Sequence, residues 1–237
     1  MFRKPFPSAK PSISQLKRKM QDAGITINDQ QLDQLWRYHN LLRSRNQDRD
    51  LTRIVGFESM VLKHYVDSMI VGKFYRLPSP LLDVGTGAGF PGIPIKIRYP
   101  HIELVLAEPR PRRVQFLKDA IKEIALTRVQ VFEHRVVSRS FRKPMAGVIT
   151  RALETMDKTF LRCSAAVKAG SVFIFMKGPN VDEELEAFEQ RFGENVKRLL
   201  DEAYTLPHSS LDRRLLVYEV VKTLEGDHAD PEDSELL

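Results

Sequence analysis

The sequence has 237 residues, and its 37 lysines and arginines outnumber its 31 aspartates and glutamates, which gives a formal net charge of +6. This length allows one domain with an extension or two small domains, and either buries a sizeable core without disulfides or a structural metal. Cys163 is the only cysteine, which excludes an intrachain disulfide and a cysteine metal cluster. No apolar run approaches the ~20 residues that span a bilayer. We expect a cytoplasmic protein that does not enter membranes.

The charge is unevenly distributed along the chain. Residues 226–237 contain five acidic residues and no lysine or arginine. The net charge of residues 1–225 is therefore more positive than that of the whole chain by five units, and residues 1–12 form a basic arm interrupted by prolines. A basic body favours a polyanionic partner, with nucleic acid ahead of an anionic membrane surface.

Helical spacing of apolar residues dominates the first third of the chain. Helices are expected over Ser14–Ala23, Asp29–Arg45 and Phe57–Phe74. Asn28 or Asp29 is expected to cap the second of them. One face of that helix carries an apolar stripe made up of Leu32, Leu35, Trp36, His39 and Leu42.

Prolines at positions 78 and 80 end this helical pattern. We therefore predict three parts of the chain. Residues 1–77 form a basic arm and a helical region, and residues 78–225 form the main domain. Residues 226–237 form an acidic tail, which we expect to be disordered.

Beyond Pro80, short apolar runs alternate with helical stretches. The runs typical of buried strands are Leu81–Val84, Glu103–Ala107, Val129–Phe132, Gly147–Thr150 and Ser171–Met176. The helices between them are expected at Ile93–Arg98, Pro111–Ile124, Met156–Val167 and Asp182–Phe192. This alternation predicts an α/β domain whose parallel sheet is covered by helices on both faces. Two last runs, Val196–Tyr204 and Arg213–Lys222, have no helix between them and predict an antiparallel pair at one edge.

A glycine-rich loop follows the first predicted strand and opens a helix. Gly85, Gly87 and Gly89 allow the backbone to turn sharply and to approach a ligand closely. The next position, where a dinucleotide-binding loop has Gly or Ala, is Phe90, and Pro91 removes an amide that a pyrophosphate would use. The loop therefore suits a ligand with a ribose and no pyrophosphate. S-adenosylmethionine meets that description.

The second predicted strand ends at Glu108, nineteen residues after Gly89. A carboxylate at this place accepts hydrogen bonds from both hydroxyls of a ribose. A solvated glutamate at a strand end is the alternative for Glu108 taken alone. Together with the glycine loop, Glu108 is the expected sugar contact.

Absent motifs narrow the choice of methyl acceptor. Enzymes that methylate exocyclic base amines typically carry Asn/Asp-Pro-Pro-aromatic after the fourth strand, where this chain has Thr150-Arg151-Ala152-Leu153. Methylation of a pyrimidine carbon needs a cysteine nucleophile, whereas Cys163 lies in an apolar helical stretch typical of a core. No Lys-Asp-Lys-Glu set for ribose methylation is evident. An atom that is already nucleophilic, such as guanine N7, therefore remains a candidate for the methyl acceptor.

The most specific motif of the chain is Asp83-Val84-Gly85-Thr86-Gly87-Ala88-Gly89-Phe90-Pro91-Gly92-Ile93-Pro94. It is accompanied by Leu51-Thr52, His64 with Asp67-Ser68, Arg113-Val114, Arg151-Ala152, Lys177-Gly178 and Arg213. On these residues, the chain from about Tyr38 to Lys222 resembles the bacterial small-subunit ribosomal RNA guanine-N7 methyltransferase family, also called glucose-inhibited division protein B. The resemblance implies a seven-stranded class I, Rossmann-like, S-adenosylmethionine-dependent methyltransferase sheet with an N-terminal helical extension. It also implies 16S ribosomal RNA as partner, free or within the small ribosomal subunit or an assembly intermediate.

By position, the resemblance implies cofactor contacts at Gly85, Phe90, Val136, Val137 and Arg151. Together with the loop and the strand end, the full predicted cofactor set is Gly85, Gly87, Gly89, Phe90, Glu108, Val136, Val137 and Arg151. The family usually has Glu where this chain has Val137. A cofactor contact through the main-chain amide of Val137 would be kept, whereas a side-chain hydrogen bond would be lost.

RNA contacts are expected from four basic residues, because Arg and Lys neutralise phosphates. These residues are Arg112, Arg113, Lys177 and Arg213. We assign no catalytic acid or base, because guanine N7 carries a lone pair and no proton. We assign no metal, because no metal-ligand spacing occurs in the sequence. Catalysis is then expected to come mainly from holding N7 in line with the methyl group.

Two other classes of protein stay compatible with the sequence. A relative that binds the cofactor without transferring its methyl group, and acts in RNA binding or ribosome assembly, is compatible with the loss of a Glu at position 137. A small-molecule methyltransferase shares the sheet, but it leaves the basic body and the helical extension without an explanation. The presence or absence of 7-methylguanosine in ribosomal RNA separates these classes.

Overall fold

The computed structural model describes residues 11–137 and 140–224 of the chain. Most of the predicted basic arm and all of the predicted acidic tail lie outside these residues. Among the helices of the described part, none has the length and the hydropathy that crossing a bilayer requires.

The chain begins with helices that confirm the predicted helical region. They are α1 (Ile13–Asp22), α2 (Asp29–Arg49), α3 (Phe57–Met60), a π-helix (Val61–Val66) and α4 (Asp67–Phe74). Asn28 caps α2, as one of the two expected residues, in a reciprocal capping box with Gln31. Ser12 and Gln15 form the same arrangement at α1. The π-helix was not predicted, because apolar spacing does not distinguish one π-turn from the α-helix around it.

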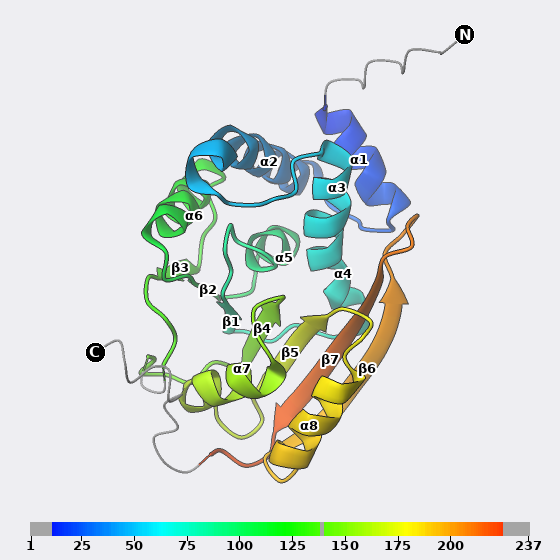
Figure 1. Ribbon diagram of the computed structural model, residues 1–237. Helices are drawn as coiled ribbons and strands as arrows, with labels where there is room; N and C mark the ends of the chain where they lie inside the picture. The colour runs from blue at the N-terminus through cyan, green and yellow to red at the C-terminus, as the bar shows by residue number, and fades with distance from the viewer. Residues whose placement is uncertain (1–10, 138–139, 225–237) are drawn as a thin grey trace.

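Within the described residues, seven strands form one mixed sheet in the order β3-β2-β1-β4-β5-β7-β6 (Figure 1). They are β1 (Leu81–Val84), β2 (Leu104–Ala107), β3 (Val129–Phe132), β4 (Gly147–Arg151), β5 (Val172–Lys177), β6 (Val196–Thr205) and β7 (Asp212–Val220). The first five strands are parallel, and β7 runs antiparallel to both β5 and β6. The predicted α/β class and the antiparallel pair at one edge are confirmed.

Helices follow the strands as predicted and cover both faces of the sheet (Figure 1). They are α5 (Gly92–Arg98), α6 (Pro111–Glu123), α7 (Met156–Cys163) and α8 (Asp182–Phe192), with a 3₁₀ turn (Ser164–Ala166) after α7. Successive strand residues point to opposite faces. Ile149 and Ile174 therefore join the core under α5, α6 and the N-terminal helices, whereas Val148 and Phe173 join the core under α7 and α8.

The N-terminal helices share a core with the sheet. Leu16 of α1 and Leu35 of α2 are fully buried in the same apolar cluster as Ile93 of α5 and Phe116 of α6. α2 and α4 pack against α5, the helix that follows the glycine loop, and α2 also packs against α6. The division of the chain at residue 78 stays a prediction.

Candidate active site

The glycine loop lies at the carboxyl end of β1, between the strand and α5. The amides of Gly85 and Thr86 both donate to the carbonyl of Ala107 on β2, at 3.0 and 3.2 Å. Gly85 has a φ of +69°, and a Cβ there would lie 2.4 Å from a methyl carbon of Leu153. Only glycine combines this conformation with this close approach.

Asp83, in β1, stabilises the glycine loop through hydrogen bonds made inside the protein. Its Oδ2 accepts hydrogen bonds from the Thr86 hydroxyl at 2.6 Å and from the Gly92 amide at 2.7 Å, which ties β1 to the start of α5. The side chain is fully buried, and burial raises the pKa of Asp83 from 3.8 to about 6. The sequence interpretation gave Asp83 no role, although it stands two residues before the first glycine.

Glu108 lies opposite the loop, where β2 ends. Its Oε2 accepts from the Gly87 amide at 3.1 Å and lies 3.8 Å from the Arg113 guanidinium, and its Oε1 accepts from the Arg110 amide at 2.9 Å. The carboxylate is 4% exposed. Two main-chain donors and one ion pair thus fix its orientation at the space above the loop.

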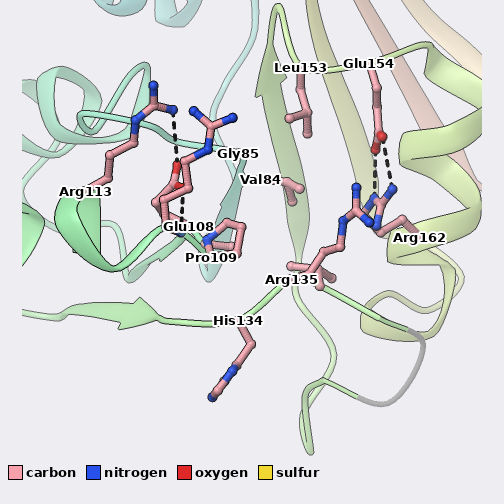
Figure 2. Close-up of a pocket in the computed structure, with 13 residues that line it drawn as sticks. Val84, Gly85, Glu108, Pro109, Arg113, His134, Arg135, Leu153, Glu154 and Arg162 are labelled. Carbon is pink, nitrogen blue, oxygen red and sulfur yellow. Dashed lines mark hydrogen bonds and ion pairs between the residues drawn. The ribbon is translucent and has the colours of Figure 1, made fainter. Parts of the chain in front are cut away.

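This space is a cavity of about 210 Å³, which we call the first cavity. Gly85, Glu108 and Val136 line it, three of the predicted cofactor residues. Figure 2 shows Glu108 and Arg113 on one side and Glu154, paired with Arg162 at 2.9 Å, on the other. Gly85 has no Cβ to block the cavity, and the carboxylate of Glu108 beside it is held in place. This arrangement suits a nucleoside whose sugar hydroxyls bind Glu108, so these residues fit S-adenosylmethionine.

The other predicted cofactor residues do not line the first cavity. Gly87 borders it through the bond to Glu108, whereas a Cβ at Gly89 would meet Ile93. Phe90 is buried in the helical core, and Val137 is 43% exposed with its amide donating to the Ser140 hydroxyl. A direct contact of these residues with the cofactor stays a prediction.

Arg151 lies at a second cavity, of about 290 Å³, at the ends of β4 and β5. Ile54 and Met176 give this cavity apolar walls. Its charged lining residues are Lys63, Asp67, Arg151, Lys177 and Arg213. Residues 151–154 divide the two cavities, because the first two of them line the second cavity and the last two line the first.

Asp67 forms ion pairs with two of the cations that line the second cavity. Its two carboxylate oxygens lie 3.2 Å from Arg151 and 3.3 Å from Arg213. Asp67 is 2% exposed, and this burial raises its pKa in spite of the two guanidinium groups. Arg151 also donates a hydrogen bond of 2.8 Å to the carbonyl of Lys63, a residue of the π-helix. Its guanidinium lies over the Phe90 ring.

His64, also in the π-helix, links the second cavity to the glycine loop. Its ring stacks on Phe90 with 4.2 Å between centroids, and its Nε2 lies 2.8 Å from the Thr52 hydroxyl. Burial, and then the nearby Arg151, lower the pKa of His64 from 6.5 to about 3. The sequence motifs included His64 and Asp67, but no pattern in the sequence indicated what they contact.

We expect the neutral state of His64 to make stability depend on pH. The unfolded chain takes up a proton on His64 below about pH 6.5 and the folded chain does not, so the free energy of unfolding should fall as the pH drops toward 4, by up to about 1.4 kcal/mol per pH unit. His39, with a pKa lowered by burial to about 4, contributes in the same direction. Asp83 acts in the opposite direction between pH 6 and 3.8.

Urea unfolding of the wild type and of His64→Gln at pH 6.5, 5.5 and 4.5 isolates the share of His64, since His39 and Asp83 are common to both proteins. The variant should lose less stability over this range. Equal pH slopes for the two proteins would contradict a neutral His64.

The four predicted RNA-binding residues differ in their surroundings. Arg112 is exposed at the start of α6. Arg113 donates to the Asp50 carbonyl at 3.2 Å, and Lys177 donates to the Glu154 carbonyl at 2.8 Å and pairs with Glu184 at 2.7 Å. Arg213 pairs with Asp67. Contacts of these residues with phosphates stay a prediction, and the last three also have contacts within the chain.

Cys163 lies in the core, as predicted. It is fully buried in α7, and burial raises the pKa of its thiol to about 12. A thiol in this state does not act as a nucleophile at neutral pH.

The matching family model and two relatives with similar sequences are all described as rRNA small subunit methyltransferase G. The family model of rRNA small subunit methyltransferase G matches residues 31–207. Ribosomal RNA small subunit methyltransferase G 2 of Syntrophobacter fumaroxidans is 43% identical over 218 residues, which are 92% of this chain and 44% of that protein. The protein of the same name from Bdellovibrio bacteriovorus is 38% identical over 211 residues, 89% of this chain and 82% of that protein.

Solved structures show the same fold at low sequence identity. The ribosomal protein L11 methylase of Lactobacillus delbrueckii subsp. bulgaricus superposes with a TM-score of 0.52 at 9% identity, over 67% of this chain and 79% of that one. TYW2 of M. jannaschii, in complex with AdoMet, gives a TM-score of 0.50 at 14% identity, over 73% of this chain and 80% of that one. These structures confirm the Rossmann-like methyltransferase sheet. Because the family model covers most of the chain, and the Bdellovibrio relative is matched over most of its own length, the chain belongs to the rRNA small subunit methyltransferase G family.

Proposed function

We propose that this protein transfers the methyl group of S-adenosylmethionine to N7 of a guanine in 16S ribosomal RNA, in the cytoplasm. The observation that carries the proposal is the pair of cavities on either side of residues 151–154. One of them combines the glycine loop with a fixed carboxylate, and the other has four cationic side chains and one carboxylate among its lining residues. Such a pair suits a nucleoside cofactor beside a polyanionic substrate.

The first cavity is the proposed cofactor site. Bound there, S-adenosylmethionine supplies an electrophilic methyl group on a positively charged sulfur. Glu108 would accept hydrogen bonds from the ribose hydroxyls, and Gly85 and Gly87 would allow the ligand to lie close to the backbone. Val136 is 2% exposed and contributes apolar surface to the same cavity.

The second cavity is the proposed site of the acceptor guanine. N7 of a neutral guanine has a lone pair and no proton, so the protein has no proton to remove. Orientation alone contributes up to roughly 7–11 kcal/mol in favourable cases. Arg151 is well suited to this role, because Asp67, the Lys63 carbonyl and the Phe90 ring hold its guanidinium in one place.

Arg112 is the proposed phosphate contact with the clearest test, because its side chain is exposed. Arg112→Ala should weaken binding of 16S ribosomal RNA. It should also reduce the slope of log K against log salt concentration by about 0.7–0.9, the share of one phosphate contact. Filter binding between low and moderate salt measures this slope. Lys197→Ala is the matched control, because Lys197 is also exposed but lies on β6 at the far edge of the sheet. An equal change in both variants would contradict a local contact.

The proposed reaction is tested by incubating the full chain with S-adenosylmethionine and either naked 16S ribosomal RNA or small ribosomal subunits from a strain that lacks the gene. Mass spectrometry of the nucleosides should show new 7-methylguanosine in one of the two substrates, and this result identifies the preferred partner. The deletion strain should lack one 7-methylguanosine. A strain that retains every 7-methylguanosine would overturn the proposal.

A relative that binds the cofactor without transferring its methyl group is a second candidate. It is favoured by Val137, where the family usually has Glu and where the main-chain amide already donates to Ser140. Binding of S-adenosylmethionine without any methylation of either RNA substrate would support this candidate instead.

A further inference from the structure

Tyr38 connects the helical N-terminal region to the glycine loop. The side chain is fully buried in α2, and its hydroxyl donates a hydrogen bond of 2.5 Å to the main-chain carbonyl of Ala88. The ring also packs against Phe90, with 5.8 Å between the centroids. Fifty residues separate Tyr38 from Ala88 in the sequence, so only the tertiary fold produces this contact.

Ala88 lies between Gly87 and Gly89, where the backbone is least restricted. The two glycines have φ angles of +61° and +102°. The Ala88–Gly89 peptide unit turns with the φ of Gly89, which no Cβ restricts, so this unit has access to several orientations. In this protein, Tyr38 binds the carbonyl of the Ala88–Gly89 peptide unit, and the amide of the same unit donates to the Thr86 carbonyl at 2.9 Å. These two hydrogen bonds select one orientation of that unit.

The orientation of this peptide unit affects the first cavity through Gly87. The Gly87 amide donates to Oε2 of Glu108 and is one of three groups that fix this carboxylate. Rotation of the Ala88–Gly89 unit breaks the hydrogen bond from the Gly89 amide to the Thr86 carbonyl. This bond closes the turn that contains Gly87, so its loss weakens the bond between the Gly87 amide and Glu108. A buried Ala88 carbonyl without a donor would favour such a rotation, since an unpaired buried carbonyl is costly.

We propose that Tyr38 is a positioning residue for S-adenosylmethionine. Its hydroxyl holds the glycine loop in the shape that binds the cofactor, so a helix outside the sheet sets the affinity of a site to which it contributes no lining residue. The inference rests on the cofactor of the proposed function, but it does not depend on the RNA substrate.

Two tyrosine variants of the full chain test the proposal. Tyr38→Phe removes only the hydroxyl that binds Ala88. Tyr65→Phe is the matched control, because Tyr65 is equally buried and its hydroxyl lies 2.8 Å from Nδ1 of His39. The substitution keeps the ring of Tyr65, which packs against Phe90 as the ring of Tyr38 does. Calorimetric titration with S-adenosylmethionine should show the dissociation constant rising on the order of tenfold for Tyr38→Phe and less than about twofold for Tyr65→Phe. Both variants should lose some thermal stability.

Amide hydrogen exchange of the ligand-free proteins gives a second, independent result. Exchange at Gly87 and Gly89 should be faster in Tyr38→Phe than in the wild type and unchanged in Tyr65→Phe. The proposal is overturned if Tyr38→Phe binds the cofactor as tightly as the wild type, or if both variants weaken binding equally. If the wild type itself gives no heat with S-adenosylmethionine, the cofactor assignment has failed. Unchanged exchange in Tyr38→Phe then separately refutes the effect of Tyr38 on the loop.

Discussion

Glu108→Ala is expected to weaken S-adenosylmethionine binding by at least about a hundredfold, because two sugar hydroxyls each lose a charged acceptor worth roughly 1.5–3 kcal/mol. The substitution also leaves the amides of Gly87 and Arg110 without the carboxylate that they now bind. Glu108→Gln keeps one oxygen as an acceptor, so its affinity should fall between those of the wild type and Glu108→Ala. Calorimetric titration measures the affinities of all three proteins.

Glu103→Ala is the control for this prediction. Glu103 stands just before β2, at the opposite end of the strand from Glu108, and its exposed side chain pairs with Arg128. Its removal should leave the cofactor affinity unchanged. Tight binding by Glu108→Ala, with a normal melting profile, would place the ribose elsewhere.

Arg151→Met is expected to destabilise the folded protein by about 3 kcal/mol, because it removes one partner of a buried carboxylate. Asp67 then retains the ion pair with Arg213 at 3.3 Å, and the Lys63 carbonyl loses the Arg151 guanidinium as a donor. We expect methyl transfer to be lost as well, since Arg151 lines the proposed acceptor cavity. Urea unfolding near pH 7.5 measures the stability, and single-turnover assays measure the transfer.

The double variant Asp67→Asn/Arg151→Met separates the two effects. Without the charge on Asp67, the missing guanidinium no longer leaves a buried carboxylate uncompensated, so more than half of the lost stability should return. Methyl transfer should stay low, because the cavity still lacks Arg151. If the double variant is as unstable as Arg151→Met, the ion pair between Asp67 and Arg151 is not the source of the stability that Arg151 provides.

Several features of the fold and the site follow from local sequence. The capping boxes at Ser12 and Asn28, the alternation of strands and helices, and the glycines after β1 depend on residues close together in the chain. Backbone conformation and apolar periodicity are properties of such short segments. Glu108 was identified from its place at the end of the second predicted strand, nineteen residues after Gly89, where a carboxylate accepts hydrogen bonds from ribose hydroxyls.

The partners of buried polar groups depended on the tertiary structure. Arg151 was predicted to contact the cofactor and Arg213 the RNA, yet both bind Asp67, which lies 84 and 146 residues away from them in the sequence. Tyr38 and His64 similarly meet the glycine loop only because α2 and the π-helix pack over it. A hydrogen bond or an ion pair between distant residues leaves no spacing pattern in the chain. The sequence by itself thus determined the elements and the glycine loop proposed to bind the cofactor, whereas only the packing of the helices on the sheet decided which charges face each other inside the site.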